Sequence, residues 1–135
     1  MGLAERRAVE RFKNDAYPDW RTKITSASGF EVPVEVAWDE LAVADNADGL
    51  GDYFVSVYFQ PLVDALNGIT FDELGKTALR DGLRQIVVRN SGQHSSNSGI
   101  TFTDGVLVFD HKPDVNVDYG DDRAKGLRQT LEAGL

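Results

Sequence analysis

The residues best suited to chemistry follow the apolar segment VLVFD in the last third of the chain. Asp114, Asn116 and Asp118 alternate there, as do the oxygen ligands that open a calcium-binding loop. A divalent cation needs several carboxylate and carbonyl oxygens, and a tight turn brings alternate residues toward one point. Asp110 and His111 precede this run and add a carboxylate and an imidazole. The predicted metal set is therefore Asp110, His111, Asp114, Asn116 and Asp118.

The same stretch departs from a calcium loop at two of its defining positions. Tyr119 stands where the loop needs a glycine, and Lys125 stands where it needs a bidentate glutamate. The alternative is a loop of Asx turns whose acids cap the helix that follows. Two interpretations stay open: a site for Ca²⁺ or Mg²⁺ with metal-assisted hydrolysis as its activity, or a structural loop with no cofactor.

Other catalytic arrangements find little support in the sequence. His94 lies among serines, but neighbouring residues rarely reach the geometry of nucleophile and base, and the chain has no G-x-S-x-G motif. Glycine motifs that bind phosphate are absent as well. The chain has no cysteine, which excludes thiolate zinc sites and cysteine nucleophiles. The balance favours a protein that is not an enzyme.

The net charge of −8 is unevenly distributed along the chain. Residues 24–75 hold ten acidic side chains and no lysine or arginine, whereas residues 1–23 hold six basic and four acidic ones. Nucleic acids and anionic membranes require a dense cationic footprint, so both are excluded as partners. A basic protein partner fits this charge, and we expect a non-catalytic interaction module of adaptor or inhibitor type.

A β-hairpin is the clearest local structure. Asp104-Gly105 stands between alternating apolar residues and accepts positive φ at both central positions of a type I′ turn. The turn pairs Ile100 with Phe109 and Phe102 with Leu107, on a face that we expect to be core. The opposite face is half polar, and a preceding strand adds two glutamates at its margin. The candidate partner-binding residues are Glu31, Glu35, Thr101, Thr103, Val106 and Val108.

The amino-terminal half is predicted to contain two short helices and one strand. Apolar residues at helical spacing indicate helices over 4–14 and 19–27, with Pro18 interrupting them. Alternation over Phe30–Trp38 predicts a strand. The proline within this strand places it at an edge of the sheet, because proline cannot donate to a hydrogen-bonded ladder.

The carboxy-terminal half is predicted to supply two more helices. Thr70 and Glu73 form a T-x-x-E capping box, which predicts a helix from Thr70 to about Leu83 with Leu74 in its buried stripe. A last helix follows near the end of the chain. Residues 53–59 have the composition of a strand, but the apolar residues after them have helical spacing, so their secondary structure stays open.

Together these elements predict one α+β domain over residues 1–135. We expect a two-layer sandwich in which three to five helices cover one face of a mainly antiparallel sheet of about four strands. The first fifteen residues carry seven charges, so they resemble no signal peptide. The uncharged run 53–63 is shorter than the ~20 apolar residues that span a bilayer. A soluble cytoplasmic protein is therefore expected, with its oligomeric state undetermined by any pattern.

Overall fold

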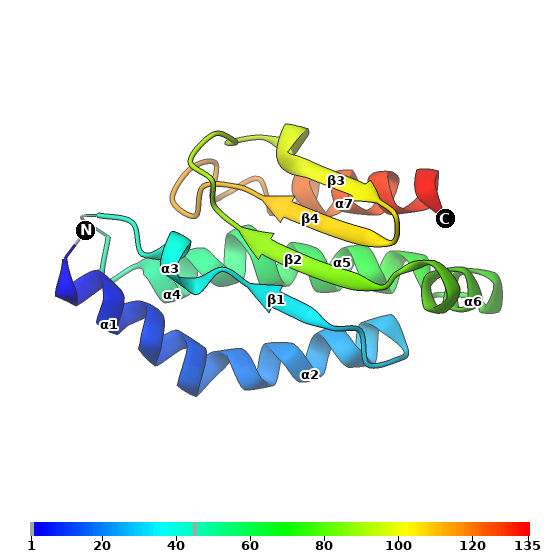
Figure 1. Cartoon of the computed structure of the whole chain (residues 1–135), viewed down its shortest axis with the longest axis horizontal. Helices are drawn as coiled ribbons and strands as arrows, with labels where there is room; N and C mark the ends of the chain where they lie inside the picture. Colours follow the sequence, from blue (N-terminus) through cyan, green and yellow to red (C-terminus); the bar gives the residue numbers. More distant parts are fainter. Residues whose placement is uncertain (1, 45) are drawn as a thin grey trace.

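The architecture is α+β, with a sheet packed against helices. A computed structural model describes residues 2–44 and 46–135, and Figure 1 shows the sheet in front of the helices. The described part of the chain forms one sheet of four strands. Its strands lie side by side in the order β1 (Val34–Val36), β2 (Gln85–Arg89), β4 (Val106–Asp110) and β3 (Ile100–Thr103).

The sheet is mixed and mostly parallel, so the prediction of a mainly antiparallel sheet is wrong. β1 pairs with β2 and β2 pairs with β4 in parallel, whereas β3 and β4 are antiparallel. β4 thus inserts between β2 and β3, which a chain of consecutive hairpins would not allow. Parallel neighbours need long crossover connections, and such connections leave no local pattern in the sequence. The predicted strand 30–38 is reduced to β1, which lies at an edge as expected.

The hairpin of β3 and β4 has the predicted register. Phe102 lies opposite Leu107, and the other pairs follow the same alignment. The turn residues both have positive φ, 54° at Asp104 and 81° at Gly105, as a type I′ turn requires. The local Asp-Gly signal therefore fixes which side chains of these two strands face the core.

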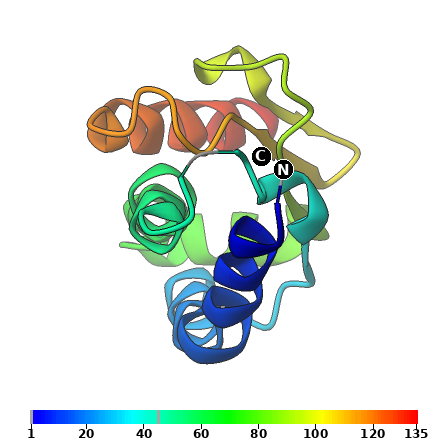
Figure 2. The ribbon, with the colours of Figure 1, turned by 90° about the vertical axis from the view of Figure 1, so that its left-hand side faces the viewer.

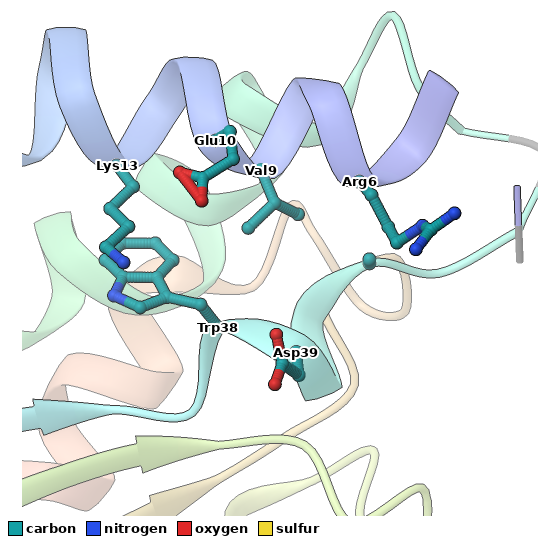
Figure 3. Close-up of a pocket in the computed structure, with 7 residues that line it drawn as sticks. Arg6, Val9, Glu10, Lys13, Trp38 and Asp39 are labelled. Atoms are coloured by element: carbon teal, nitrogen blue, oxygen red, sulfur yellow. The ribbon is translucent and has the colours of Figure 1, made fainter. Parts of the chain in front are cut away.

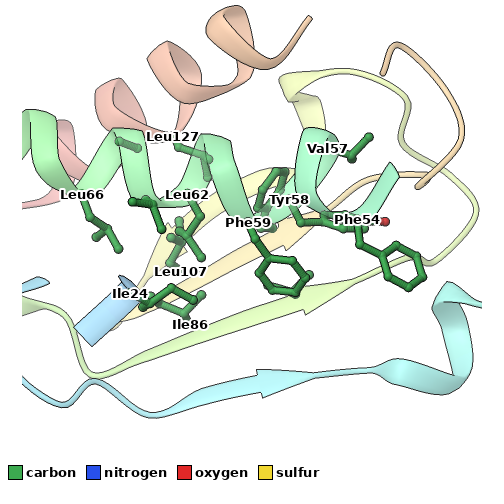
Figure 4. Close-up of a cluster of buried hydrophobic side chains, with 14 of the residues drawn as sticks. Ile24, Phe54, Val57, Tyr58, Phe59, Leu62, Leu66, Ile86, Leu107 and Leu127 are labelled. Carbon is green, nitrogen blue, oxygen red and sulfur yellow. The ribbon is translucent and has the colours of Figure 1, made fainter. Parts of the chain in front are cut away.

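The helices cover one face of the sheet. Figure 2 shows α5 and α7 on one side of the strands. The helices of this layer are α2 (Tyr17–Ser28), α5 (Gln60–Ile69) and α7 (Gly120–Gly134). Their apolar side chains meet Ile86 and Leu107 of the sheet in one buried cluster (Figure 4). Full burial of such a side chain contributes roughly 1.5–3 kcal/mol, so this cluster is the main source of stability.

Two long helical segments form most of the helix layer. α1 (Leu3–Arg11) continues through a π-helical turn, η1 (Phe12–Ala16), into α2. α4 (Leu50–Phe54) continues through a second π-helical turn, η2 (Val55–Phe59), into α5. Residues 53–59 are therefore helical, although their composition suits a strand. Most side chains of η2 are buried in the core, which explains why the segment is so apolar (Figure 4).

Each π-helical turn precedes a proline. Proline has no N–H, and in an α-helix its ring clashes with the carbonyl four residues earlier. The residue before each proline donates its N–H to the carbonyl five residues earlier, Tyr17 to Phe12 and Gln60 to Val55. The wider turn admits the proline without ending the helix. The predicted interruption at Pro18 is therefore wrong.

The helix α6 (Glu73–Gly82) begins later than the capping box predicts. Its N-cap is Asp72, whose carboxylate accepts the N–H of Gly75 at 2.8 Å. The Thr70 hydroxyl donates instead to backbone carbonyls outside α6. The predicted burial of Leu74 is also wrong, because the side chain faces solvent. Two short helices, α3 (Trp38–Leu41) and the 3₁₀ turn η3 (Asn97–Gly99), lie in the remaining connections.

Candidate functional site

The face of the sheet that the helices leave uncovered holds most of the predicted partner-binding residues. In Figure 1 no helix of the described chain crosses the near face of β2 and β4. Strand pairing aligns the outward residues in two rows: Glu35, Val87, Val108 and Thr101, then Gln85, Val106 and Thr103. The polar members Glu35, Thr101 and Thr103 are exposed, and the valines are half-buried. Glu31 precedes β1 and is exposed too.

The charges around this sheet face are few and partly neutralised. The side chain of Gln85 donates to the Glu35 carboxylate at 3.4 Å. Arg89 forms a bidentate pair with Glu40, with N–O distances of 3.2 and 2.9 Å. The apolar content of the face consists of valines, which bury less area than leucine or phenylalanine. It is therefore a half-polar surface without a large apolar anchor.

A second uncovered surface lies on and beside α6, and the sequence did not predict it. Phe71 and Leu74 expose 80% and 79% of their surfaces, and Leu135 exposes 37%. Together with Ala78 they line a groove of about 440 Å³. We call this surface, Phe71, Leu74, Ala78 and Leu135, the α6 patch. Contiguous large apolar side chains are seldom exposed on a monomer, and where they are, they mark interaction sites.

The groove of the α6 patch has acidic walls, and one of its two acids is paired, because Nε of Arg128 lies 3.7 Å from Oε1 of Glu132. The charged residues that line its groove are Asp72 and Glu132. A local signal for this surface was present in the sequence. Aspartate is at least as good an N-cap as threonine, so Asp72 competed with Thr70 as the first residue of the helix. A helix capped at Asp72 leaves Leu74 in the first, exposed turn.

Three buried polar side chains gather where β4 ends and α7 begins. Asp110, His111 and Arg123 expose 8%, 1% and 2% of their surfaces. Tyr58 reaches them from η2 and donates its hydroxyl to the backbone carbonyl of His111. Burial, with the Asp110 carboxylate as a smaller cause, raises the pKa of Tyr58 far above its ordinary value. Its hydroxyl therefore remains a hydrogen-bond donor at any physiological pH.

Arg123 connects α7 to the π-helical turn η2. Its Nε donates to the carbonyl of Val57 at 2.9 Å, and its Nη2 donates to that of Ser56 at 3.4 Å. In an α-helix the Val57 carbonyl would pair with the N–H of residue 61, which is a proline. Arg123 supplies the missing donor, and burial lowers its pKa. Sequence reasoning missed this residue, although Pro61 signals carbonyls that need an outside donor.

The predicted metal set is not brought to one point. Asp110 and His111 are buried, whereas Asp114, Asn116 and Asp118 are exposed. The carboxylate of Asp110 accepts a backbone N–H at 2.9 Å, and that of Asp114 accepts an amide N–H at 3.1 Å. Among the described residues, no three His, Asp or Glu side chains are placed to hold a metal ion. Metal binding at this loop stays a prediction from the sequence.

A separate hollow of about 490 Å³ lies between α1 and α3 (Figure 3). Its apolar lining comes from Val9, Ala42 and the half-buried ring of Trp38. Two basic and two acidic side chains surround it: Arg6, Lys13, Glu10 and Asp39. Because these charges balance, the hollow favours no class of charged ligand over another.

No helix in residues 2–44 or 46–135 combines the length and apolarity that crossing a membrane requires. The function must be inferred from the surfaces described above. Comparison with known proteins supplies no relative, because no protein-family model, curated protein or solved structure matches this chain.

Proposed function

We propose that this protein is a non-catalytic interaction module, of adaptor or inhibitor type, that binds a basic protein partner through the α6 patch. The exposure of Phe71 and Leu74 carries this proposal. Both side chains belong to a segment that is firmly anchored, since Leu79 of α6 is fully buried. A helix held by a buried side chain, with large apolar side chains exposed in its first turn and just before its N-cap, is suited to receive a partner.

The α6 patch can supply the affinity that such a module needs. Burying the side chains of Phe71 and Leu74 against a partner contributes roughly 1.5–3 kcal/mol each. Interface hot spots are commonly a few large side chains seated in a pocket. The groove of about 440 Å³ beside them accommodates side chains of the partner.

Charge supports a basic partner. Asp72 and Glu132 line the groove, and the chain carries a net charge of −8. Two copies of this chain would bring these acids together, so repulsion disfavours self-association through the patch. A basic segment with an apolar stripe, such as an amphipathic helix, meets both requirements.

The uncovered sheet face is the second contact surface to be tested within the same function. It contains the residues proposed from the sequence: Glu31, Glu35, Thr101, Thr103, Val106 and Val108. Its exposed side chains are small or polar, so it contributes less apolar burial than the α6 patch. Variants of the two surfaces separate their contributions.

Capture from native lysate tests the proposal with two matched variants. Phe71→Ser/Leu74→Ser removes the apolar side chains of the α6 patch, and Val106→Thr/Val108→Thr removes those of the sheet face without adding charge. We expect wild type and the sheet variant to retain the same basic protein, more weakly at high salt, and the α6 variant to lose it. Thermal melting confirms that both variants fold. Equal retention by the α6 variant, or an acidic partner, contradicts the proposal.

A further inference from the structure

A small polar pocket lies where β2 and β4 end, beside the first turn of α7. Its volume is about 210 Å³, and residues from the loops after both strands line it. In open sheets with parallel strands, ligands bind outside the carboxyl ends of the strands. The position and the lining of this pocket both favour a small-molecule ligand rather than a protein partner.

His111 lies in the lining of the pocket and leaves one nitrogen without a partner. Its Nδ1 lies 2.6 Å from the backbone carbonyl of Lys112, and a carbonyl can only accept, so Nδ1 carries the proton. Burial is the main cause that lowers the pKa of His111, against weaker backbone contacts of Lys112 and Ser95 that favour the charged ring. The neutral ring leaves a lone pair on Nε2, which is buried and makes no hydrogen bond. Such an acceptor calls for a donor.

The walls of the pocket offer acceptors, together with the hydroxyls of Ser95, Ser96 and Tyr119, which can donate or accept. The carboxylate of Asp122 receives one long hydrogen bond, 3.3 Å from the amide of Asn97, which leaves most of its accepting capacity open. Asn116 donates its own amide N–H to the carbonyl of Ser95, so its side-chain oxygen is the group it can offer. Arg123, the remaining cation of the lining, donates to backbone carbonyls. A ligand with several hydroxyl groups, each able to donate and to accept, matches this lining.

The charges of the lining and the phenol ring of Tyr119 restrict the class of ligand further. Arg123 and Asp122 carry opposite charges and His111 is neutral, so any charged ligand meets a like charge as well as an opposite one. Tyr119 exposes 62% of its surface beside the pocket and presents a flat apolar ring. A molecule with many hydroxyl donors and one apolar face matches this combination.

We propose that this pocket binds a small neutral polyol, with the dimensions of one sugar ring. Its hydroxyls donate to Asp122, Asn116 and Nε2 of His111, and its apolar face stacks on Tyr119. A volume of about 210 Å³ is below the range of roughly 300–1,000 Å³ for drug-sized ligands, in keeping with a single ring. This site is independent of the α6 patch.

NMR of the whole ¹⁵N-labelled protein tests the proposal with glucose, galactose, mannose and myo-inositol as probes. Without a probe, the ring signals of His111 should report a protonated Nδ1 and a bare Nε2. At least one polyol should show saturation transfer from the protein and should move the Nε2 signal. Sodium phosphate and Zn²⁺, added separately, should leave that signal in place.

Variants locate the binding. Tyr119→Ala should raise the Kd of the bound polyol about five- to tenfold by removing the stacking face, whereas Tyr119→Phe retains binding. Asn116→Gly should raise it about fivefold by removing one acceptor. Glycine fits there because Asn116 has a φ of 54°. Phe71→Ala, an exposed aromatic elsewhere, should leave the Kd unchanged.

Three results would overturn the polyol site. The first is that none of the four polyols gives saturation transfer or moves the His111 ring signals. The second is that phosphate or Zn²⁺ moves those signals and the polyols do not. The third is that Nε2, rather than Nδ1, carries the proton in the free protein. None of these results affects capture of a partner by the α6 patch, so the two proposals fail separately.

Discussion

The α6 patch and the uncovered sheet face are both open to solvent, yet they differ in kind. A half-polar face is ordinary for a sheet that helices cover on one side, since alternate side chains must point away from the core. Phe71 and Leu74 are different, because two large apolar side chains at 80% and 79% exposure have no such geometric reason. Exposed large apolar surface, rather than an uncovered sheet face, therefore distinguishes a candidate interface.

The largest expected effect separates the two sides of α6. Leu79 is fully buried, so Leu79→Ala should lower the free energy of unfolding by about 2–5 kcal/mol. Leu74→Ala on the same helix should change it by no more than about 0.5 kcal/mol, because the side chain is exposed. Urea denaturation measures both. A large loss from Leu74→Ala would mean that this side chain is part of the core and not of an interface.

A smaller effect tests what determines the sides of the sheet. Gly105 has a φ of 81°, and an added Cβ would lie 2.7 Å from side-chain carbons of Arg84. Gly105→Ala should therefore cost about 1–3 kcal/mol of unfolding free energy. Asp104→Gly, at a φ of 54°, is the matched control and should cost little. If alanine at position 105 is tolerated, the turn does not determine which residues of the hairpin face the core.

The smallest effect comes from the polar cluster, which belongs to neither surface. The pKa of His111 is lowered in the folded protein, so below about pH 6.5 the unfolded chain binds a proton that the folded chain resists. The neutral ring's contribution to the free energy of unfolding is therefore fully present above this pH. The free energy of unfolding decreases as the pH drops toward the folded pKa. The slope for one proton is at most about 1.4 kcal/mol per pH unit.

Two histidine variants assign this pH dependence. His94→Gln should keep the decline in stability seen in the wild type, because the lowered pKa that causes it belongs to His111. His111→Phe should remove the decline, whatever its effect on stability at pH 7. Denaturation series across the window measure the slopes. A wild-type protein that gains stability as the pH falls through this window would contradict a neutral, buried His111.

Local patterns predicted the hairpin and the edge position of β1, but not the parallel pairing of the sheet. Asp104-Gly105 fixes its neighbours through backbone geometry, and the register follows residue by residue. The parallel pairs of β1 with β2 and of β2 with β4 join segments that are distant in sequence. Their alignment depends on how the helices pack, and no spacing within one strand records it. An antiparallel sheet was the natural but wrong extension of the hairpin.

The candidate surfaces show the same limit. The uncovered sheet face followed from alternation along the hairpin, whereas the α6 patch depended on which of two good caps, Thr70 or Asp72, begins the helix. The role of Arg123 was harder still to predict from the sequence. The residue occupies an amphipathic helix, where a basic side chain is usually solvated. Its burial is due to the Val57 carbonyl in another helix, which Pro61 leaves without a donor.

Methyl NMR of the protein with its captured basic partner tests the central claim most directly. Leucine and valine methyl groups report both surfaces in one spectrum, with the buried Leu79 as an internal reference. We predict that the methyl signals of Leu74 shift on binding, while those of Val106 and Val108 stay in place. Shifts at the two valines with Leu74 unchanged would contradict the account and assign the interaction to the sheet face.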